Sequence, residues 1–200
     1  MPFLTSRGYA VLRPQYRGSA GLGRDLWMAG DNQWGLAMQD DKDPGAALQA
    51  GILLAGKDRI AIFGYSYGGF AAAAAAVRSP SPYQCAISGA PVTDLGRLGT
   101  SWSDNRLQRI LQGRTVKGMD PMLNTDKAVL PTLLFVGDRD VRTPAFHARG
   151  FYNAIKGKVP AQFELIADMP HSTPWYPRHA LQTLNLLEGF LAKDCGPGGL

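Results

Sequence analysis

One serine stands at the centre of a Gly-x-Ser-x-Gly turn over residues 64–68. The strand-forming run 60–63 precedes this turn, and an alanine-rich stretch expected to be helical over residues 70–78 follows it. Such an elbow strains the serine backbone, and small residues two positions away on either side let strand and helix approach closely. Ser66 is therefore a candidate nucleophile for acyl transfer, with the amide of Tyr67 aimed at a developing oxyanion. A passive serine in a structural turn is the alternative, and the flanking strand and helix favour the elbow.

Carboxylates and a histidine follow two later strands, in the chain order serine, acid, histidine. The apolar run 130–136 predicts a buried parallel strand, and Asp138 and Asp140 come directly after it. A second predicted strand over residues 161–167 leads into His171. Because the carboxyl ends of parallel strands meet at one edge of an open sheet, these side chains should lie beside the serine.

The general base is expected to be His171, because it alone among the three histidines follows a strand end. His147 and His179 fall within expected helices, where they pack or face water. Asp138 and Asp140 are both candidates for the acid, and both could instead be solvated loop residues.

Seven segments, in order along nearly the whole chain, resemble the catalytic domain of the prolyl oligopeptidase family of serine peptidases. The resemblance is to the acylaminoacyl- and dipeptidyl-peptidase-like branch, and it is carried by residues 7–12, 16–23, 34–35 with 40–41, 64–70, 88–94, 137–144 and His171. It implies an α/β-hydrolase fold. The family's Gly-x-x-Asp motif maps the acid onto Asp140, with Asp138 as the alternative, and the family's usual valine before the proline is Thr143 here.

Two features of such relatives are missing from this sequence: a β-propeller, and a strand ending in a His-Gly-Gly-Pro-like loop that helps to build the oxyanion hole. We therefore expect an N-terminally truncated member, with a single α/β-hydrolase domain over residues 1–200. The missing strand would lie between strands 10–14 and 60–63. These two strands are expected to pair directly, because a sheet core does not tolerate unpaired backbone groups. The loop 15–19 would then replace the missing loop, which makes Tyr16 the candidate second oxyanion donor.

The predicted fold is a minimal α/β-hydrolase, a mostly parallel sheet with helices on both faces, because strands alternate with helices along the chain. Strands are expected at residues 10–14, 60–63, 85–88, 132–136 and 162–167. Helices are expected at residues 2–7, 34–55, 70–78, 105–112, 144–156 and 178–192. The irregular stretch 95–127 is expected to carry a cap or specificity element.

Two further side chains, Tyr65 in the elbow and Arg17 in the glycine-rich loop, are candidate substrate contacts. For Arg17 a structural bond to loop carbonyls or to a carboxylate is favoured. The predicted chemistry requires no metal or organic cofactor, and the sequence has no metal-spaced cluster of cysteine and histidine.

The composition limits which binding partners and which cellular location are expected. The net charge is +5, but the basic residues are scattered singly, so we expect no nucleic-acid binding. The sequence has no apolar run of ~18 residues and no signal-peptide core, which predicts no membrane contact and a cytoplasmic location. Cys85 and Cys195 are expected to be unpaired thiols, as is typical of a reducing compartment.

These observations lead to the hypothesis of a carboxylesterase acting on short acyl esters, since esters need less oxyanion stabilisation than amides. The alternatives are a serine peptidase, an acyltransferase, and an inactive remnant that serves as an interaction module. The substrate would be a small ester or a peptide. A homodimer is also expected, because the outer edge of strand 10–14 would be open to another strand.

Overall fold

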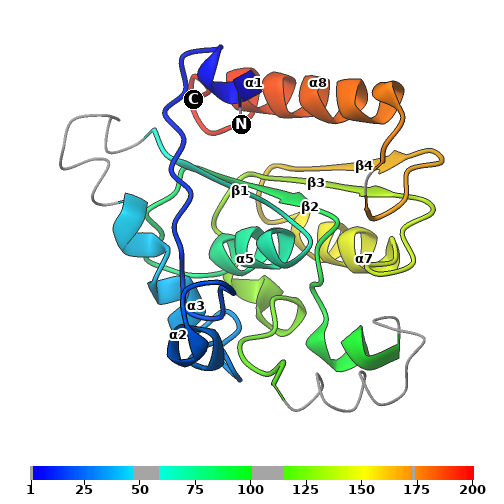
Figure 1. The fold of residues 1–200 in the computed structure, drawn as a ribbon. Helices are drawn as coiled ribbons and strands as arrows, with labels where there is room; N and C mark the ends of the chain where they lie inside the picture. Colours follow the sequence, from blue (N-terminus) through cyan, green and yellow to red (C-terminus); the bar gives the residue numbers. More distant parts are fainter. Residues whose placement is uncertain (1, 47–58, 101–114, 173) are drawn as a thin grey trace.

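The computed structural model describes residues 2–46, 59–100, 115–172 and 174–200. Four strands form one parallel sheet in the order β1 (Ala61–Tyr65), β2 (Cys85–Gly89), β3 (Thr132–Gly137) and β4 (Ala161–Ile166). Each strand pairs with the next one in sequence, and helices connect them (Figure 1). The predicted α/β-hydrolase architecture is confirmed in this parallel, helix-covered sheet.

Helices cover both faces of the sheet (Figure 1). The long helix α8 (Pro177–Lys193) and the short α1 (Pro2–Thr5) lie on one face, and α5 (Tyr67–Ala76) and α7 (Phe146–Ile155) lie on the other. Side chains of β3 alternate between the layers: Leu133 and Phe135 pack in the cluster of α8, whereas Leu134 and Val136 pack in the cluster of α7. A strand buried on both faces must be apolar throughout, which explains the continuous apolar run in the sequence.

Helix α5 lies directly behind the serine turn and is buried on all sides. Its six consecutive alanines, residues 71–76, are at most 2% exposed. A helix that is apolar all round belongs in a core, and methyl side chains let it lie close to the sheet. It begins at Tyr67, three residues earlier than expected.

Most other elements begin and end within two residues of their predicted bounds, but the expected helix 34–55 is wrong in its described part. Its described part holds the short α3 (Ala37–Asp40) and, after a turn, helical residues 43–46. The short α2 (Arg24–Met28) precedes this range. Gly35 has a φ of +66°, which a right-handed helix excludes, and Trp34 forms an isolated bridge with Gly118. The stretch 95–127, which was expected to be irregular, carries the 3-10 helices η1 (Leu95–Thr100) and η2 (Met122–Lys127). The expected helix 105–112 lies outside the described residues.

The predicted strand 10–14 is also wrong. Residues 9–16 run past β1 without joining the sheet (Figure 1), and a cavity of about 860 Å³ is lined by both segments. The ends of this segment are held elsewhere: the Arg7 guanidinium contacts Glu188 on α8 at 2.6 Å, and that of Arg17 contacts Asp41 at 2.7 Å. The homodimer stays a prediction, but the strand edge from which it was inferred does not exist.

The two cysteines form a disulfide, so the prediction of unpaired thiols is wrong. Cys85 begins β2 and Cys195 follows α8, and both are fully buried. The sequence gives no sign of this pairing because 110 residues separate the two. Disulfides are typical of oxidising compartments, which does not favour the predicted cytoplasmic location. Across the described residues, no helix combines the length and the apolarity needed to cross a membrane.

The disulfide closes a long loop and should therefore stabilise the fold. We expect Cys195→Ser to lower the free energy of unfolding by about 2–5 kcal/mol. Urea unfolding with and without dithiothreitol checks this: reductant should destabilise the wild type and leave the variant unchanged. Two free thiols in the denatured, unreduced wild-type protein would contradict the pairing.

His147 on α7 is fully buried in its neutral form. Its Nδ1 accepts the backbone N–H groups of Thr93 and Asp94, each at 3.4 Å. Burial lowers the pKa of His147 from 6.5 to about 4. Between these two values the unfolded chain binds the proton more tightly, so acid favours unfolding.

Stability should therefore fall as the pH drops from 6.5 towards 4. We expect the wild type to lose about 2–3 kcal/mol more between pH 7 and pH 4.5 than His147→Gln, which keeps a polar side chain but does not titrate. Urea unfolding at the two pH values measures the difference. An equal loss in both proteins would mean that His147 is not the group that takes up the proton.

Candidate active site

The turn after β1 is a strained strand-to-helix elbow. Ser66 has φ 60° and ψ −116°, a conformation that side chains rarely adopt. Helix α5 touches both β1 and β2: a Cβ on Gly64 of β1 would lie 2.2 Å from the backbone of Gly68, and one on Gly69 would lie 2.2 Å from the oxygen of Gly89 at the end of β2. Glycine is therefore required at Gly64 and Gly69, and the strain turns the serine side chain out of the sheet.

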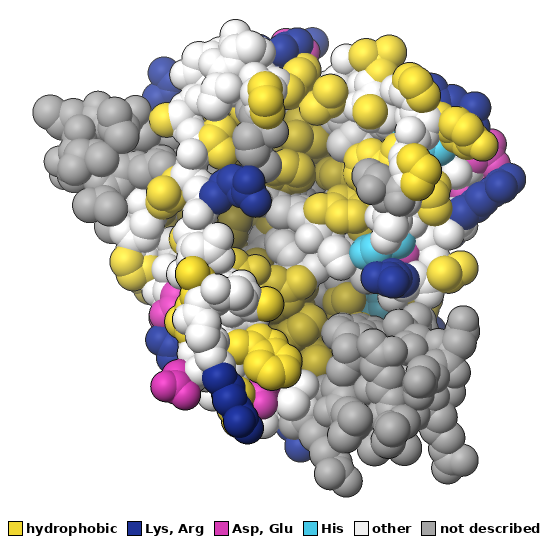
Figure 2. Space-filling view, in the orientation of Figure 1, with side chains coloured by type: hydrophobic (Ala, Val, Ile, Leu, Met, Phe, Trp, Pro, Cys, Tyr) yellow, Lys and Arg dark blue, Asp and Glu magenta, His cyan; other side chains and the backbone are white. Residues whose placement is uncertain are grey.

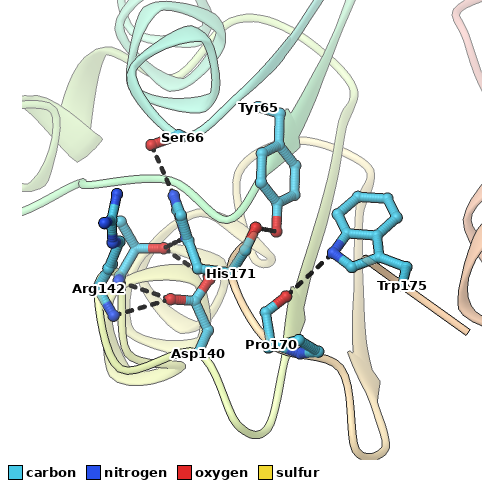
Figure 3. Close-up of polar contacts among 8 residues, drawn as sticks. Tyr65, Ser66, Asp140, Arg142, Pro170, His171 and Trp175 are labelled. Atoms are coloured by element: carbon cyan, nitrogen blue, oxygen red, sulfur yellow. Dashed lines mark hydrogen bonds and ion pairs between the residues drawn. The ribbon is translucent and has the colours of Figure 1, made fainter. Parts of the chain in front are cut away.

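A continuous chain of hydrogen bonds runs from this serine to the loop after β3 (Figure 3). The Oγ of Ser66 lies 2.9 Å from Nε2 of His171, and Nδ1 of His171 lies 2.7 Å from Oδ2 of Asp140. The three residues follow the carboxyl ends of β1, β4 and β3, which is why one sheet edge brings them together. In this arrangement the imidazole can accept the serine proton while the carboxylate fixes its tautomer.

The two aspartates in the loop after β3, Asp138 and Asp140, have different surroundings. Asp140 is only 4% exposed, and its Oδ1 accepts the backbone N–H groups of Arg142 and Thr143 at 3.0 and 2.8 Å. The Thr143 hydroxyl donates to Oδ2 at 2.9 Å and lies 3.2 Å from His171 Nδ1. Asp138 is exposed and makes none of these side-chain contacts. Of the two candidate acids, only Asp140 reaches the histidine.

The histidine loop is held by aromatic side chains (Figure 3). The Tyr65 hydroxyl donates to the backbone oxygen of His171 at 3.0 Å, and the Trp175 indole donates to that of Pro170 at 3.2 Å. Burial raises the pKa of the Tyr65 phenol, with a further rise from the negative charge of Asp140, so the hydroxyl stays a donor. Tyr65, predicted as a substrate contact, thus positions the loop of His171.

Tyr67 is the first residue of α5, so its N–H has no partner within the helix and lies at the positive end of the helix dipole. The ring of Tyr67 stacks on that of Tyr16 at 5.7 Å, and both rings contact the ammonium of Lys42. Burial lowers the pKa of Lys42 to about 8. Sequence reasoning missed Lys42, because nothing in its neighbourhood distinguishes it from a surface lysine.

An apolar cavity of about 590 Å³ opens beside Ser66 and His171. Its large lining side chains include Tyr16, Trp27, Met28, Trp34, Met38 and Val92. Figure 2 shows hydrophobic side chains gathered in the hollow on this face of the molecule. Sequence reasoning missed Trp27, Met28 and Met38, which come from short, irregular segments with no helical or strand periodicity.

Arg17 does not line this cavity. Its guanidinium makes two bonds of 2.7 Å to the two oxygens of Asp41, and its own backbone N–H donates to Asp41 at 2.9 Å. This is the structural role that was favoured from the sequence. Within the described ranges, no group of three or more His, Cys, Asp and Glu residues could hold a metal ion.

A strained serine at a strand-to-helix elbow, hydrogen-bonded to a histidine and an aspartate at the edge of a parallel sheet, is the arrangement typical of serine hydrolases with the α/β-hydrolase fold. The sequence model of the prolyl oligopeptidase family matches residues 1–196. The chain belongs to this family, as the resemblance indicated.

Its curated relatives include a dipeptidyl aminopeptidase BIII from Pseudoxanthomonas mexicana, which is 28% identical over 97% of this chain and 30% of its own length. The acylamino-acid-releasing enzyme of Mus musculus is 27% identical over 84% of this chain and 25% of its own length. Among solved structures, a puromycin-hydrolyzing peptidase of Mycobacterium tuberculosis has a TM-score of 0.78 at 22% identity, over 90% of this chain and 29% of its own. The chain thus spans about a third of these relatives or less.

Thr143 touches both the acid and the base, and we expect it to position them. Thr143→Val removes a hydrogen bond to a charged group, which is worth about 1.5–3 kcal/mol, so the rate of Ser66 labelling by a fluorophosphonate should fall roughly 10- to 100-fold. Thr143→Ser keeps the hydroxyl and should restore the rate. Thr132→Val is the matched control, because Thr132 is buried in β3 and its hydroxyl donates to the backbone oxygen of Leu130, away from Asp140 and His171. Equal losses in Thr143→Val and Thr132→Val would indicate general destabilisation instead.

Proposed function

We propose that this chain carries the catalytic centre of a serine peptidase, with Ser66 as nucleophile, His171 as general base and Asp140 as the acid that orients it. The observation that carries the proposal is the hydrogen-bonded series Ser66, His171 and Asp140 beside an apolar cavity. The cavity suits a substrate with a large apolar side chain next to the bond that is cleaved.

In the first half of the reaction, Ser66 Oγ attacks the carbonyl carbon of the substrate while Nε2 of His171 takes its proton. The N–H of Tyr67 donates to the oxyanion. Tyr16, which lines the same cavity, remains the candidate for the second donor. The C–N bond then breaks as His171 returns the proton to the leaving amine. Water, activated by His171, releases the acyl group from Ser66 in the second half.

Peptide bonds are the favoured substrates, in place of the short acyl esters expected from the sequence. The curated relatives are named as a dipeptidyl aminopeptidase and an acylamino-acid-releasing enzyme, and none of the comparisons supports a carboxylesterase. The expectation of an ester substrate assumed a weakened oxyanion hole, which slows amide hydrolysis more than ester hydrolysis but does not identify the substrate. An inactive interaction module is disfavoured by a serine, a histidine and an aspartate already within bonding distance.

The three residues should act as one unit. We expect Ser66→Ala and His171→Ala to remove nearly all turnover, and Asp140→Asn to lower kcat on the order of 10⁴-fold by favouring the wrong imidazole tautomer. Asp138→Asn is the matched control, two residues away and exposed, and should leave kcat within a factor of two or so. A larger loss in Asp138→Asn than in Asp140→Asn would reassign the acid.

Substrate class is tested with p-nitroanilides of phenylalanine, acetyl-phenylalanine and a dipeptide ending in phenylalanine, alongside p-nitrophenyl butyrate. The proposal expects at least one amide to be cleaved by the wild type and not by Ser66→Ala. Cleavage of the ester alone would restore the carboxylesterase hypothesis. An alcohol added as acceptor, with product analysis, would reveal acyl transfer in place of hydrolysis.

A further inference from the structure

A lysine ammonium is buried beside the nucleophile elbow, and none of the reaction steps of Ser66 and His171 uses it. Lys42 lies in the turn between α3 and helical residues 43–46, and it is only 8% exposed. Its Nζ donates to the backbone oxygen of Met38. Among the described residues, no carboxylate forms an ion pair with it. Burying a charge without a counter-charge is costly, so its other contacts must replace the lost hydration.

Those other contacts are with two tyrosines. The ammonium lies 3.6 Å from the centroid of the Tyr16 ring, 5.2 Å from that of Tyr67 and 3.5 Å from the Tyr67 hydroxyl. Both rings are within reach of cation–π attraction, which strengthens where water is excluded. Lys42 therefore joins three segments that are distant in the sequence: the loop that carries Tyr16, the turn after α3 and the start of α5.

The ring of Tyr67 is attached directly to the catalytic backbone. Tyr67 follows Ser66 and is the first residue of α5. Its ring also meets that of Trp34 edge-on, with 4.5 Å between centroids, and its hydroxyl lies 3.4 Å from Sδ of Met38. Because the N–H proposed to donate to the oxyanion belongs to the same residue, a displaced ring would also displace that donor.

We propose that Lys42 is a positioning residue, whose ammonium holds the rings of Tyr16 and Tyr67 and thereby fixes the Tyr67 N–H towards the oxyanion. This inference rests on the proposed function, since it gives Lys42 a part in the same reaction. A neutral amine has the same shape but no cation–π attraction. Catalysis should therefore depend on the charge of Lys42.

The surroundings of Lys42 place its change of charge within reach of a pH titration. Burial lowers the pKa of Lys42 to about 8, and the positive charge of Arg78 acts in the same direction. The carboxylates of Asp41 and Asp43 act against this, but each is paired with an arginine. The side chain is therefore an ammonium at pH 7 and largely a neutral amine at pH 9.5.

Four tyrosines and two arginines are the other ionisable groups on the segments around Lys42: Tyr16, Tyr65, Tyr67, Tyr83, Arg13 and Arg59. Burial raises the pKa of all four phenols, and an arginine side chain keeps its proton throughout this range. Compared with these groups, Lys42 is the one whose charge changes between pH 7 and pH 9.5.

The first test measures the rate at which a fluorophosphonate labels Ser66 between pH 7 and pH 9.5. The wild-type rate should fall roughly 10- to 30-fold as Lys42 loses its proton. Lys42→Arg keeps a charge that can stack on both rings, so its rate should stay level with pH. Lys42→Met should already be slower than the wild type by the same factor at pH 7. A level wild-type profile, or a wild-type rate in Lys42→Met at pH 7, would overturn the proposal.

Two controls separate positioning from general stability. Lys42→Met should not lower the free energy of unfolding, because it replaces a desolvated charge with an apolar side chain of similar shape. A labelling loss accompanied by an equivalent loss of stability would make the role of Lys42 purely structural. Lys156→Met is the matched variant, since Lys156 also lies over a tyrosine ring, at 5.3 Å from that of Tyr152, but is exposed. Its labelling rate should stay within a factor of two or so.

The second test does not depend on catalysis, because it uses Ser66→Ala. The NMR resonance of the Tyr67 Cα should shift with a midpoint near pH 8 and should stay constant when Lys42→Arg is added. A shift that persists with Lys42→Arg would contradict the inference. A wild type that is never labelled would refute the proposed function, and with it the part of Lys42 in catalysis. A labelled wild type whose Tyr67 does not respond to Lys42 would refute this inference alone.

Discussion

The close approach of β1 and α5 at Gly64 and Gly68 is the constraint on which the site depends. A Cβ on Gly64 would overlap the backbone of Gly68, so only glycine at position 64 allows the chain to turn from strand to helix at the single residue Ser66. Six alanines behind the turn let α5 follow this tight path without pushing the sheet apart. The Tyr67 N–H at the helix start and the outward serine are two results of one backbone geometry. A larger residue at Gly64 would disturb both together.

Signals that are local in the sequence predicted the structure well. The elbow, the buried strand before Asp140, the partly buried strand before His171, and the amphipathic helices α7 and α8 each depend on a short pattern of apolar residues. The topology of a parallel sheet then brings residues 66, 140 and 171 to one edge without further information. The choice of Asp140 over Asp138 needed the family motif, because periodicity alone cannot tell two acids in one loop apart.

Features that depend on distant contacts were missed. The segment 10–14 has strand-forming residues, but bonds from Arg7 to Glu188 and from Arg17 to Asp41 hold it away from β1, and neither ion pair is visible in a local pattern. The disulfide joins positions 110 residues apart, and the cavity lining comes from short helices whose bounds carry no periodic signal. Local sequence patterns thus predict the strands and helices of the sheet, whereas contacts between distant residues determine the disulfide, the path of residues 10–14 and the lining of the cavity.

The bond between Cys85 and Cys195 also determines how the chain responds to a protease. Every residue from β2 to the end of α8 lies within the covalent ring that it closes, including Asp140 and His171, whereas Ser66 lies outside. One backbone cut anywhere in the ring, for example in the loop before η2, yields two pieces that remain covalently joined. In a molecule cut once in this ring, Ser66, Asp140 and His171 would therefore remain covalently linked, and only a gel run under reducing conditions would separate the two fragments.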